Sequence, residues 1–398
     1  MLDLVPLFLD LISFDTMSDE VSTTYPSSEK ESEFADKLVE ILHSIGVSNA
    51  YKDEYSLVYA HVDNNKEKTI GLIAHMDTSP ALKGGIKNPR IIKNYDGKDI
   101  KLNDKYLMEV NEFPFLKEIQ GDDIIVTDGE HLLGGDDKAG IAIILTFVNY
   151  YINHKDEFNY NLAISFTPDE EIGKGALHFD VKKMKADVAY TLDGGSIFEA
   201  SYENFNAAHA NLKIYGVGVH PGSAKNIMVN AAMLASEYVL LLPSEMVPEK
   251  TENREGFIHL TDIKGDVEEA SLSFILRDHD KDLLEEKKVI MQKALETLKN
   301  KYPHGKFELT IEDDYRNMFD YFKNDMTAIN LINKAYLNSN VKLTYSPIRG
   351  GTDGATITYL GLPCPNLGVG DFSPHGRFEV VSINQMEKMV EILKELFK

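Results

Sequence analysis

Cysteine is almost absent from this sequence, which contains only Cys364. One thiol cannot form an intrachain disulfide, and one sulfur cannot build a thiolate zinc site. A reducing compartment fits such a chain, so we expect a cytoplasmic protein. Cys364 lies between two prolines without a basic neighbour. We therefore interpret it as a packed core residue and not as a nucleophile.

Long apolar runs and an excess of positive charge are also missing. No apolar run reaches the roughly 18 residues that a membrane span requires. Residues 1–14 are apolar, but Asp3 and Asp10 interrupt them, and the features of a signal peptide are lacking. We expect a core helix there. The net charge of −23 repels phosphate backbones and anionic lipids, which argues against nucleic acid and membranes as partners.

The composition that is present favours a folded chain with more than one domain. The 398 residues exceed the roughly 250–300 at which single cores stop growing, and 43% of them are hydrophobic. Short apolar runs typical of buried strands occur at 69–74, 162–166 and 188–192, and helical spacing occurs at 29–46 and 138–151. Alternating strands and helices predict an α/β fold with a mostly parallel central sheet.

The middle of the chain has a different pattern. Its order of strand, helix, strand, strand, helix and strand matches a split βαβ sandwich. These elements are expected at 208–214, 230–242, 257–264, 270–277, 280–300 and 307–311. We therefore predict a catalytic domain of residues 1–204 and 314–398. An inserted βαββαβ domain of residues 205–313 would serve as a lid or a dimerisation surface.

Potential metal ligands follow three of the predicted buried strands. Because open α/β sheets bind ligands beyond the carboxyl ends of their strands, these side chains should converge. An acidic pair that opens a helix and a histidine in a loop near the C-terminus join them. The candidates are His75, Asp77, Asp136, Asp137, Glu170, Glu171, Asp193 and His375.

Imidazole nitrogen and carboxylate oxygen are ligands that zinc accepts, and two neighbouring zinc ions need shared and private ligands. Asp77 lies two residues after His75, where it can fix the tautomer of the imidazole. In the pair Glu170-Glu171, one glutamate can bind metal while the other acts as general base. Each feature alone has an ordinary interpretation, such as Asp136 capping a helix. Their joint occurrence at successive strand ends favours a metal site.

Four segments resemble the peptidase T family. They are 75–80 (HMDTSP), 133–140 (LGGDDKAG), 166–175 (FTPDEEIGKG) and 348–354 (IRGGTDG). This family comprises the tripeptide aminopeptidases among the two-zinc exopeptidases related to carboxypeptidase G and aminoacylase. The resemblance extends over essentially the whole chain, including the inserted domain. It implies a hydrolase that uses two zinc ions to remove the N-terminal residue from tripeptides.

The resemblance also implies a role for each metal-site candidate. Glu170 would be the general base, Asp77 would orient His75, and the peptide bond between Asp136 and Asp137 would be cis. One zinc ion would be held by His75 and Asp193 and the other by Glu171 and His375, with Asp136 bridging them.

Four residues of the inserted domain or near it are implied as substrate contacts. His220 lies in a turn between a strand and a helix, and the residue pattern alone leaves open whether it faces the cleft. By resemblance it would polarise the scissile carbonyl. Asn230, Arg277 and Arg349 would bind the substrate carboxylate, which a planar guanidinium matches with two hydrogen bonds. An ordinary ion pair is the alternative for both arginines.

Rival interpretations share much of this evidence. A dipeptidase, a carboxypeptidase or an N-acyl amino acid deacylase of the same fold would use the same metal residues. A non-catalytic peptide-binding protein would keep the fold without needing Glu170. A purely structural dimer module would leave the cleft residues without a role. A short peptide is the expected ligand, and a homodimer through the inserted domain is compatible with the pattern.

Overall fold

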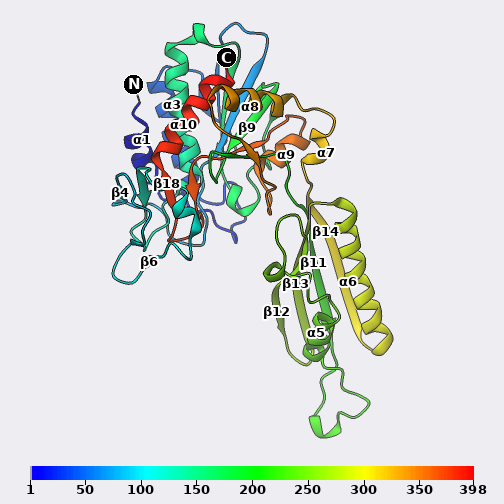
Figure 1. Ribbon diagram of the computed structural model, residues 1–398. Helices are drawn as coiled ribbons and strands as arrows, with labels where there is room; N and C mark the ends of the chain where they lie inside the picture. The colour runs from blue at the N-terminus through cyan, green and yellow to red at the C-terminus, as the bar shows by residue number, and fades with distance from the viewer. Residues whose placement is uncertain (1) are drawn as a thin grey trace. The chain divides into compact units, whose positions relative to one another are not determined.

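The computed structural model describes residues 2–398 and contains two compact units. The first comprises the described residues up to Tyr202 together with Asp320–Ser346 and Thr352–Lys398. The second comprises Glu203–Phe319 and Pro347–Gly351. Figure 1 shows a separate sheet in each of them.

A mixed, mostly parallel sheet forms the centre of the first unit. Strand β3 runs parallel to its neighbours β8 and β9, and β9 runs parallel to β16. The antiparallel pairings lie towards the two edges. In spatial order the strands are β1 (Tyr51–Lys52), β2 (Val58–Val62), β8 (Asn161–Thr167), β3 (Thr69–His75), β9 (Val188–Leu192), β16 (Asn366–Leu367), β10 (Glu199–Ser201) and β15 (Thr344–Tyr345). The α/β fold predicted from the sequence is confirmed.

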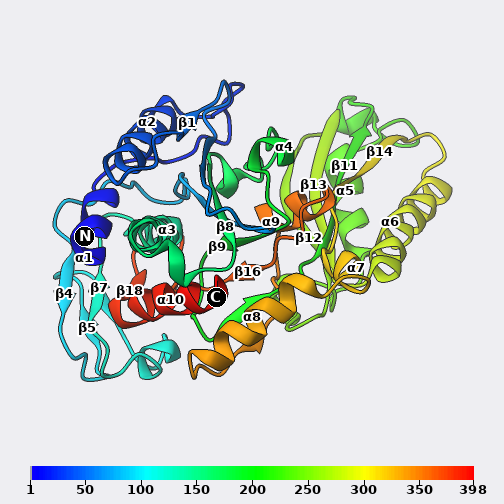
Figure 2. The ribbon, with the colours of Figure 1, turned by 90° about the horizontal axis from the view of Figure 1, so that it is seen from above.

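Helices cover both faces of this sheet. Helix α3 packs on β3 and against α1 and α10, and α10 also packs against α8; Figure 2 shows α3 beside α10. Helices α4 and α9 contribute to a core cluster with Tyr59, Ile73 and Ala189 of the sheet. The helices are α1 (Leu4–Leu11), α2 (Glu29–Ser44), α3 (Gly135–Asn153), α4 (Val181–Met184), α7 (Phe319–Phe322), α8 (Thr327–Asn338), α9 (Asp353–Tyr359) and α10 (Ile383–Leu396).

The N-terminal helix is shorter than the predicted range of residues 1–14. Helix α1 ends at Leu11, and Met1, which was included in the prediction, lies outside the described residues. The central strands agree with prediction because continuous apolar runs mark strands that are buried on both faces. Cys364 is buried as expected. Among residues 2–398, no helix combines the length and apolarity that crossing a bilayer requires.

Smaller strands complete the first unit. A second sheet has the order β17 (Asp371–Phe372), β18 (Val380–Ser382), β7 (Ile124–Val126) and β4 (Arg90–Ile92), and β5 (Ile100–Lys101) pairs with β6 (Leu107–Met108). Its core includes Phe372 and Val380, so the segment that carries His375 is anchored at both ends by packed strands.

The second unit is an antiparallel sheet with two helices packed against it. The chain order is β11 (Asn206–Tyr215), α5 (Ala231–Leu240), β12 (Phe257–Gly265), β13 (Glu269–Asp278), α6 (Lys281–Lys301) and β14 (Lys306–Tyr315). The spatial order β12-β13-β11-β14 is that of a split βαβ sandwich. Alternating residues of β11, including Leu212 and Ile214, enter a core shared with α5 and α6.

Candidate active site

Adjacent parallel strands bring the predicted ligands of the first unit together. His75 is the last residue of β3, Asp193 follows β9, and the pair Glu170-Glu171 opens a short 3₁₀ turn beyond β8. Because β8, β3 and β9 are parallel neighbours, their carboxyl ends lie at one edge of the sheet. The convergence expected from the sequence therefore follows from strand order.

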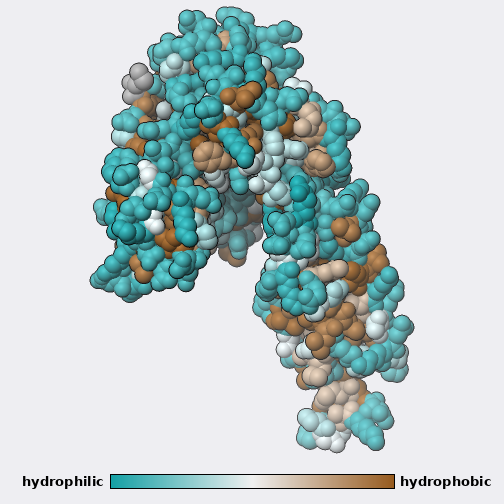
Figure 3. All heavy atoms as spheres, viewed as in Figure 1, coloured by the Kyte–Doolittle hydropathy of each residue, from teal (hydrophilic) through white to brown (hydrophobic). Residues whose placement is uncertain are grey.

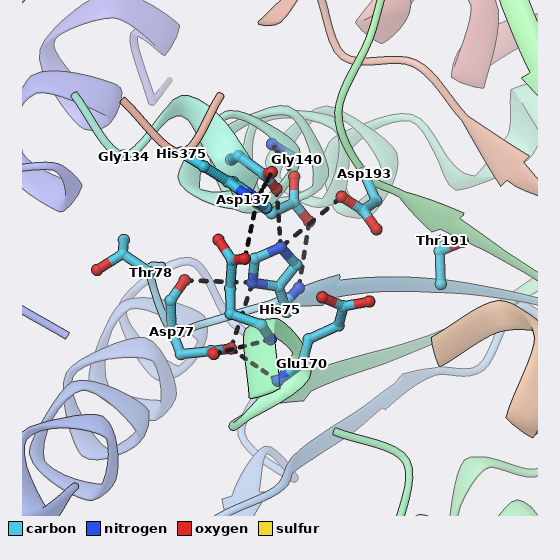
Figure 4. A network of polar contacts seen from close by, with 12 residues as sticks. His75, Asp77, Thr78, Gly134, Asp137, Gly140, Glu170, Thr191, Asp193 and His375 are labelled. Carbon is cyan, nitrogen blue, oxygen red and sulfur yellow. Dashed lines mark hydrogen bonds and ion pairs between the residues drawn. The ribbon is translucent and has the colours of Figure 1, made fainter. Parts of the chain in front are cut away.

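His75 lies at the centre of the cluster (Figure 4). Its Nε2 is 2.8 Å from Oδ1 of Asp136 and 3.7 Å from Oδ1 of Asp193. On the other side of the ring, Nδ1 is 3.3 Å from Oδ1 of Asp77. The ring is almost fully buried. Contacts on both nitrogens fix its orientation.

Asp136 also contacts the second histidine. Its Oδ2 is 3.1 Å from Nε2 of His375, which is 2.9 Å from Oε2 of Glu171. Asp136 therefore touches one histidine with each oxygen. Ligand atoms of His75, Asp136 and Glu171 all lie within 4.8 Å of one another, which is the spacing of a metal-binding group.

Asp137, to which the resemblance assigned no metal ion, belongs to a second such group with His75 and Asp193. Its Oδ2 accepts a hydrogen bond of 3.1 Å from the His75 backbone N–H, and its Oδ1 accepts one of 3.2 Å from Gly140 N–H. Asp137 therefore caps the regular part of α3, which leaves the Asp136 carboxylate for the histidines. The peptide bond between Asp136 and Asp137 is cis, as the resemblance implies.

The turn that carries the two glutamates is held by Asp77. Oδ1 of Asp77 accepts from Glu170 N–H at 3.0 Å, and Oδ2 accepts from Glu171 N–H at 3.1 Å. One fully buried carboxylate thus contacts His75 and fixes the backbone of both glutamates. Figure 4 shows the Glu170 side chain directed away from Asp77, on the side of Asp193 and Thr191.

A narrow gap lies beside Glu170. Asp193, Thr191 and Asp353 are among the residues that line it. Asp353 accepts a 2.7 Å hydrogen bond from the hydroxyl of Thr167. Asp353 belongs to the motif of residues 348–354, but its role could not be predicted from the sequence. Its place beside Glu170 depends on the fold, so no local spacing could have indicated it.

Burial dominates the electrostatics of the cluster. Burial, followed by the negative charge of Asp193, raises the pKa of Glu170 well above its usual value. Burial likewise raises the pKa of Glu171 and of Asp193, each with a further contribution from the charge of Asp136. Hydrogen bonds to Asp136 and Glu171 raise the pKa of His375 to about 11. Such crowded carboxylates favour cations at this edge of the sheet.

The donor set fits a bound metal on two further observations. Oε1 of Glu171 is buried without a hydrogen-bond partner among the described residues. Imidazole nitrogens and carboxylate oxygens together suit zinc and similar divalent ions. The first unit therefore contains a candidate metal site with Asp136 between its two histidines.

The four residues predicted to contact substrate all belong to the second unit, where each forms hydrogen bonds with neighbouring residues. His220 is exposed, and its Nδ1 accepts from Gly222 N–H at 3.1 Å. Asn230 caps α5 by accepting from Met233 N–H at 3.1 Å. These two side chains shape the ends of helical segments in this unit.

Both predicted arginines bind backbone carbonyls. Arg277 donates to the carbonyls of Ala208 and Leu276 and lies 3.5 Å from the carboxylate of Asp314. Arg349 donates through Nη1 to Asn253 and Glu255 at 2.8 and 2.9 Å. Its guanidinium also lies over the rings of two phenylalanines. Arg349 thus joins the returning segment 347–351 to the loop before β12.

Comparisons with known proteins agree with this fold. A model of the peptidase dimerisation domain of M20 enzymes matches residues 202–306. An aminopeptidase from Bacillus cereus superposes with a TM-score of 0.77 at 20% identity, covering 99% of this chain and 97% of that one. A tripeptidase from Staphylococcus aureus gives the same TM-score at 21% identity, with the same coverage. The chain therefore has the fold of these peptidases.

Sequence similarity identifies the family within this class. A peptidase T from Clostridium perfringens is 46% identical over 394 residues, which are 98% of this chain and 97% of the relative. A peptidase T from Clostridium botulinum is 46% identical over 401 residues, covering 100% and 98%. The chain belongs to the peptidase T family and is a peptidase. The family predicted from the four motifs is confirmed.

Replacing Asp77 by Asn tests its part in ordering this site. An amide nitrogen cannot accept a hydrogen bond from a backbone N–H, so the N–H of either Glu170 or Glu171 would lose its acceptor. The His75 ring would lose the negative charge beside its Nδ1. We expect kcat for peptide hydrolysis to fall about 10- to 100-fold. Steady-state kinetics with circular dichroism as a folding check measure this. Asp53→Asn is the control, since Asp53 also accepts two backbone N–H bonds, from Tyr55 and Leu57. Equal kcat in Asp77→Asn and wild type would contradict the role.

Proposed function

We propose that this protein is a cytoplasmic two-zinc aminopeptidase that removes the N-terminal residue from tripeptides. The observation that carries the proposal is the contact of one carboxylate, Asp136, with both histidines of the donor cluster. Membership of the peptidase T family and the tripeptidase among the similar structures support the substrate class. The single buried cysteine suits a reducing compartment.

Five side chains would hold the metals. His75 and Asp193 would hold one zinc ion, Glu171 and His375 the other, and Asp136 would contact both. When bound, the ions would polarise the scissile carbonyl and lower the pKa of an attacking water. His75, Asp136 and Glu171 expose little of their side chains, whereas 51% of the His375 side chain is exposed, so the cluster meets solvent on the His375 side.

Glu170 would move the proton. It lies next to the proposed ligand Glu171, and its side chain lines the space between Asp193 and Asp353. Its raised pKa brings the carboxylate closer to the range in which a group exchanges protons near neutral pH. Glu170 would accept a proton from the attacking water and return it to the leaving amine. Asp77 would hold the backbone of Glu170 during both transfers.

Substrate contacts are proposed for the second unit. His220 would polarise the scissile carbonyl, and Asn230, Arg277 and Arg349 would bind the carboxylate of the tripeptide. The two arginines are already oriented by backbone carbonyls, which would lower the entropy cost of binding a carboxylate.

Glu170→Gln separates proton transfer from metal binding. The amide keeps the size of the side chain but cannot act as a base. We expect kcat to fall about 10²- to 10⁴-fold with the metal content unchanged. Kinetics and elemental analysis of the same preparation measure both quantities. Glu171→Gln is the matched control and should lower the metal content. Near-normal turnover by Glu170→Gln would refute the assignment of the base.

A peptide panel with metal removal tests the reaction itself. We expect cleavage of tripeptides with a free amine, loss of activity in a chelator, and recovery on adding zinc. Di- and tetrapeptides, and tripeptides with an acetylated amine, should react much more slowly. Chromatography of the products shows which residue is released. Preferred cleavage of dipeptides, of C-terminal residues or of N-acyl groups would instead establish one of the related hydrolase activities.

The second unit is also proposed to join two copies of the chain. It contains the region that matches the dimerisation domain, and Figure 3 shows hydrophobic side chains at its surface. Leu240 and Met233 of α5 are 84% and 65% exposed, and β12 is an edge strand with Ile263 exposed. Unpaired edges and exposed apolar side chains are typical of interfaces.

Light scattering after size exclusion tests the dimer. We expect a mass twice the 44.7 kDa of one chain. Leu240→Glu should shift the mass towards one chain, because burying a carboxylate in an apolar interface is costly. Glu296→Ala, a change on the other helix of the unit, is the control. A wild-type mass of one chain at micromolar concentration would contradict the proposal.

A further inference from the structure

The turn that carries Glu170 and Glu171 is bound by a second buried carboxylate, from a distant part of the sequence. Glu31 lies in the first turn of α2 and is completely buried. Its Oε2 accepts from Asp169 N–H at 2.9 Å. Its Oε1 accepts from Ser28 N–H at 3.2 Å. One side chain therefore caps its own helix and holds the residue before the catalytic pair.

The contact is reciprocal. The Asp169 carboxylate accepts from Ser27 N–H at 2.8 Å, so the beginning of α2 and the turn bind each other twice. A third contact holds the far end of the same loop, where the hydroxyl of Tyr25 donates to the carbonyl of Gly175 at 3.0 Å. Residues 25–31 thus form a platform for loop 169–175.

The backbone of the turn explains why it needs such support. Asp169 has φ of 58° and ψ of 23°, in the left-handed region that side chains with a Cβ disfavour. The consecutive N–H groups of Asp169, Glu170 and Glu171 point to carboxylate oxygens, the first to Glu31 and the others to Asp77. These three hydrogen bonds fix the backbone of the turn and therefore the position of the Glu170 Cα, from which the side chain extends.

We infer that Glu31 is a positioning residue for the reaction, acting through Asp169 on Glu170 and Glu171. The inference rests on the proposed roles of these two glutamates as base and ligand. Misplacing a catalytic group by about 1 Å can cost about 100-fold in rate. Glu31 touches neither substrate nor metal, so its loss should change kcat far more than KM.

Glu31→Ala removes the acceptor of both backbone N–H groups. We expect kcat for tripeptide hydrolysis to fall about 10- to 100-fold, with KM within about threefold of wild type. Hydrogen exchange of a peptide spanning 167–173 should become at least about tenfold faster, since the Asp169 N–H loses its partner. Glu31→Gln keeps a carbonyl oxygen that can face Asp169 N–H, so it should recover kcat to within about threefold.

Asp53→Ala is the matched control. Asp53 lies in the same unit, is also buried, and likewise accepts two backbone N–H bonds, but these come from Tyr55 and Leu57. It should lower the unfolding temperature without changing kcat or exchange at 167–173. If Glu31→Ala does not fold, Glu31→Asp takes its place, because the shorter side chain cannot reach both segments.

The results decide the inference in either direction. Equal losses of kcat in the Glu31 and Asp53 variants would overturn it, as would a Glu31→Ala kcat within about threefold of wild type. Wild-type protein that cleaves no tripeptide would overturn the proposed function instead. If no tripeptide is cleaved, hydrogen exchange still tests whether residues 25–31 support loop 169–175. Unchanged exchange at 167–173 in Glu31→Ala would overturn that support.

Discussion

The contact of Asp136 with both histidines is the interaction on which the site depends. Its two oxygens approach Nε2 of His75 and Nε2 of His375, which come from segments 300 residues apart in the chain. The hydrogen bonds from both histidines overcome the effect of burial and lower the pKa of Asp136 below its usual value. Asp136 therefore remains ionised while burial raises the pKa of its neighbours Glu171 and Asp193. In the proposed function, this carboxylate is the ligand that two metal ions would share.

A cluster of this kind needs support, because buried carboxylates repel one another. The support consists largely of backbone N–H groups. Asp77 accepts two, Glu31 accepts two, and Glu379 accepts from Leu133, Gly134 and Asp136. Hydrogen bonds from N–H groups stabilise carboxylates without adding a net charge of their own. The positive charge that remains to be supplied can then come from metal ions and from substrate.

The sequence predicted the features that depend on local pattern. Continuous apolar runs marked β3, β8 and β9, and the polar residues that follow them marked the edge where the cluster forms. Some roles that depend on three-dimensional contact were not predicted. Asp136 and Asp137 have the same side chain, and only the place where the regular part of α3 begins shows that Asp137 caps the helix. Glu31 had the spacing of a capping box with Ser28, but its bond to Asp169 joins positions 138 residues apart.

The same distinction separates reaction chemistry from specificity. Each of the rival hydrolase activities would use the same histidines and carboxylates of the first unit. These residues therefore account for hydrolysis but not for the choice of peptide. The residues that would read the substrate carboxylate have bonds of their own. Arg349 uses both Nη1 hydrogens on the carbonyls of the loop that precedes β12. Its Nη2 donates to the carbonyl and the hydroxyl of Thr251 at 3.3 and 3.1 Å, so a carboxylate that binds this guanidinium must use Nε or displace one of these bonds, and its direction is therefore restricted. In the proposed function, a scaffold that fixes the arginine in advance would contribute to the choice of peptide.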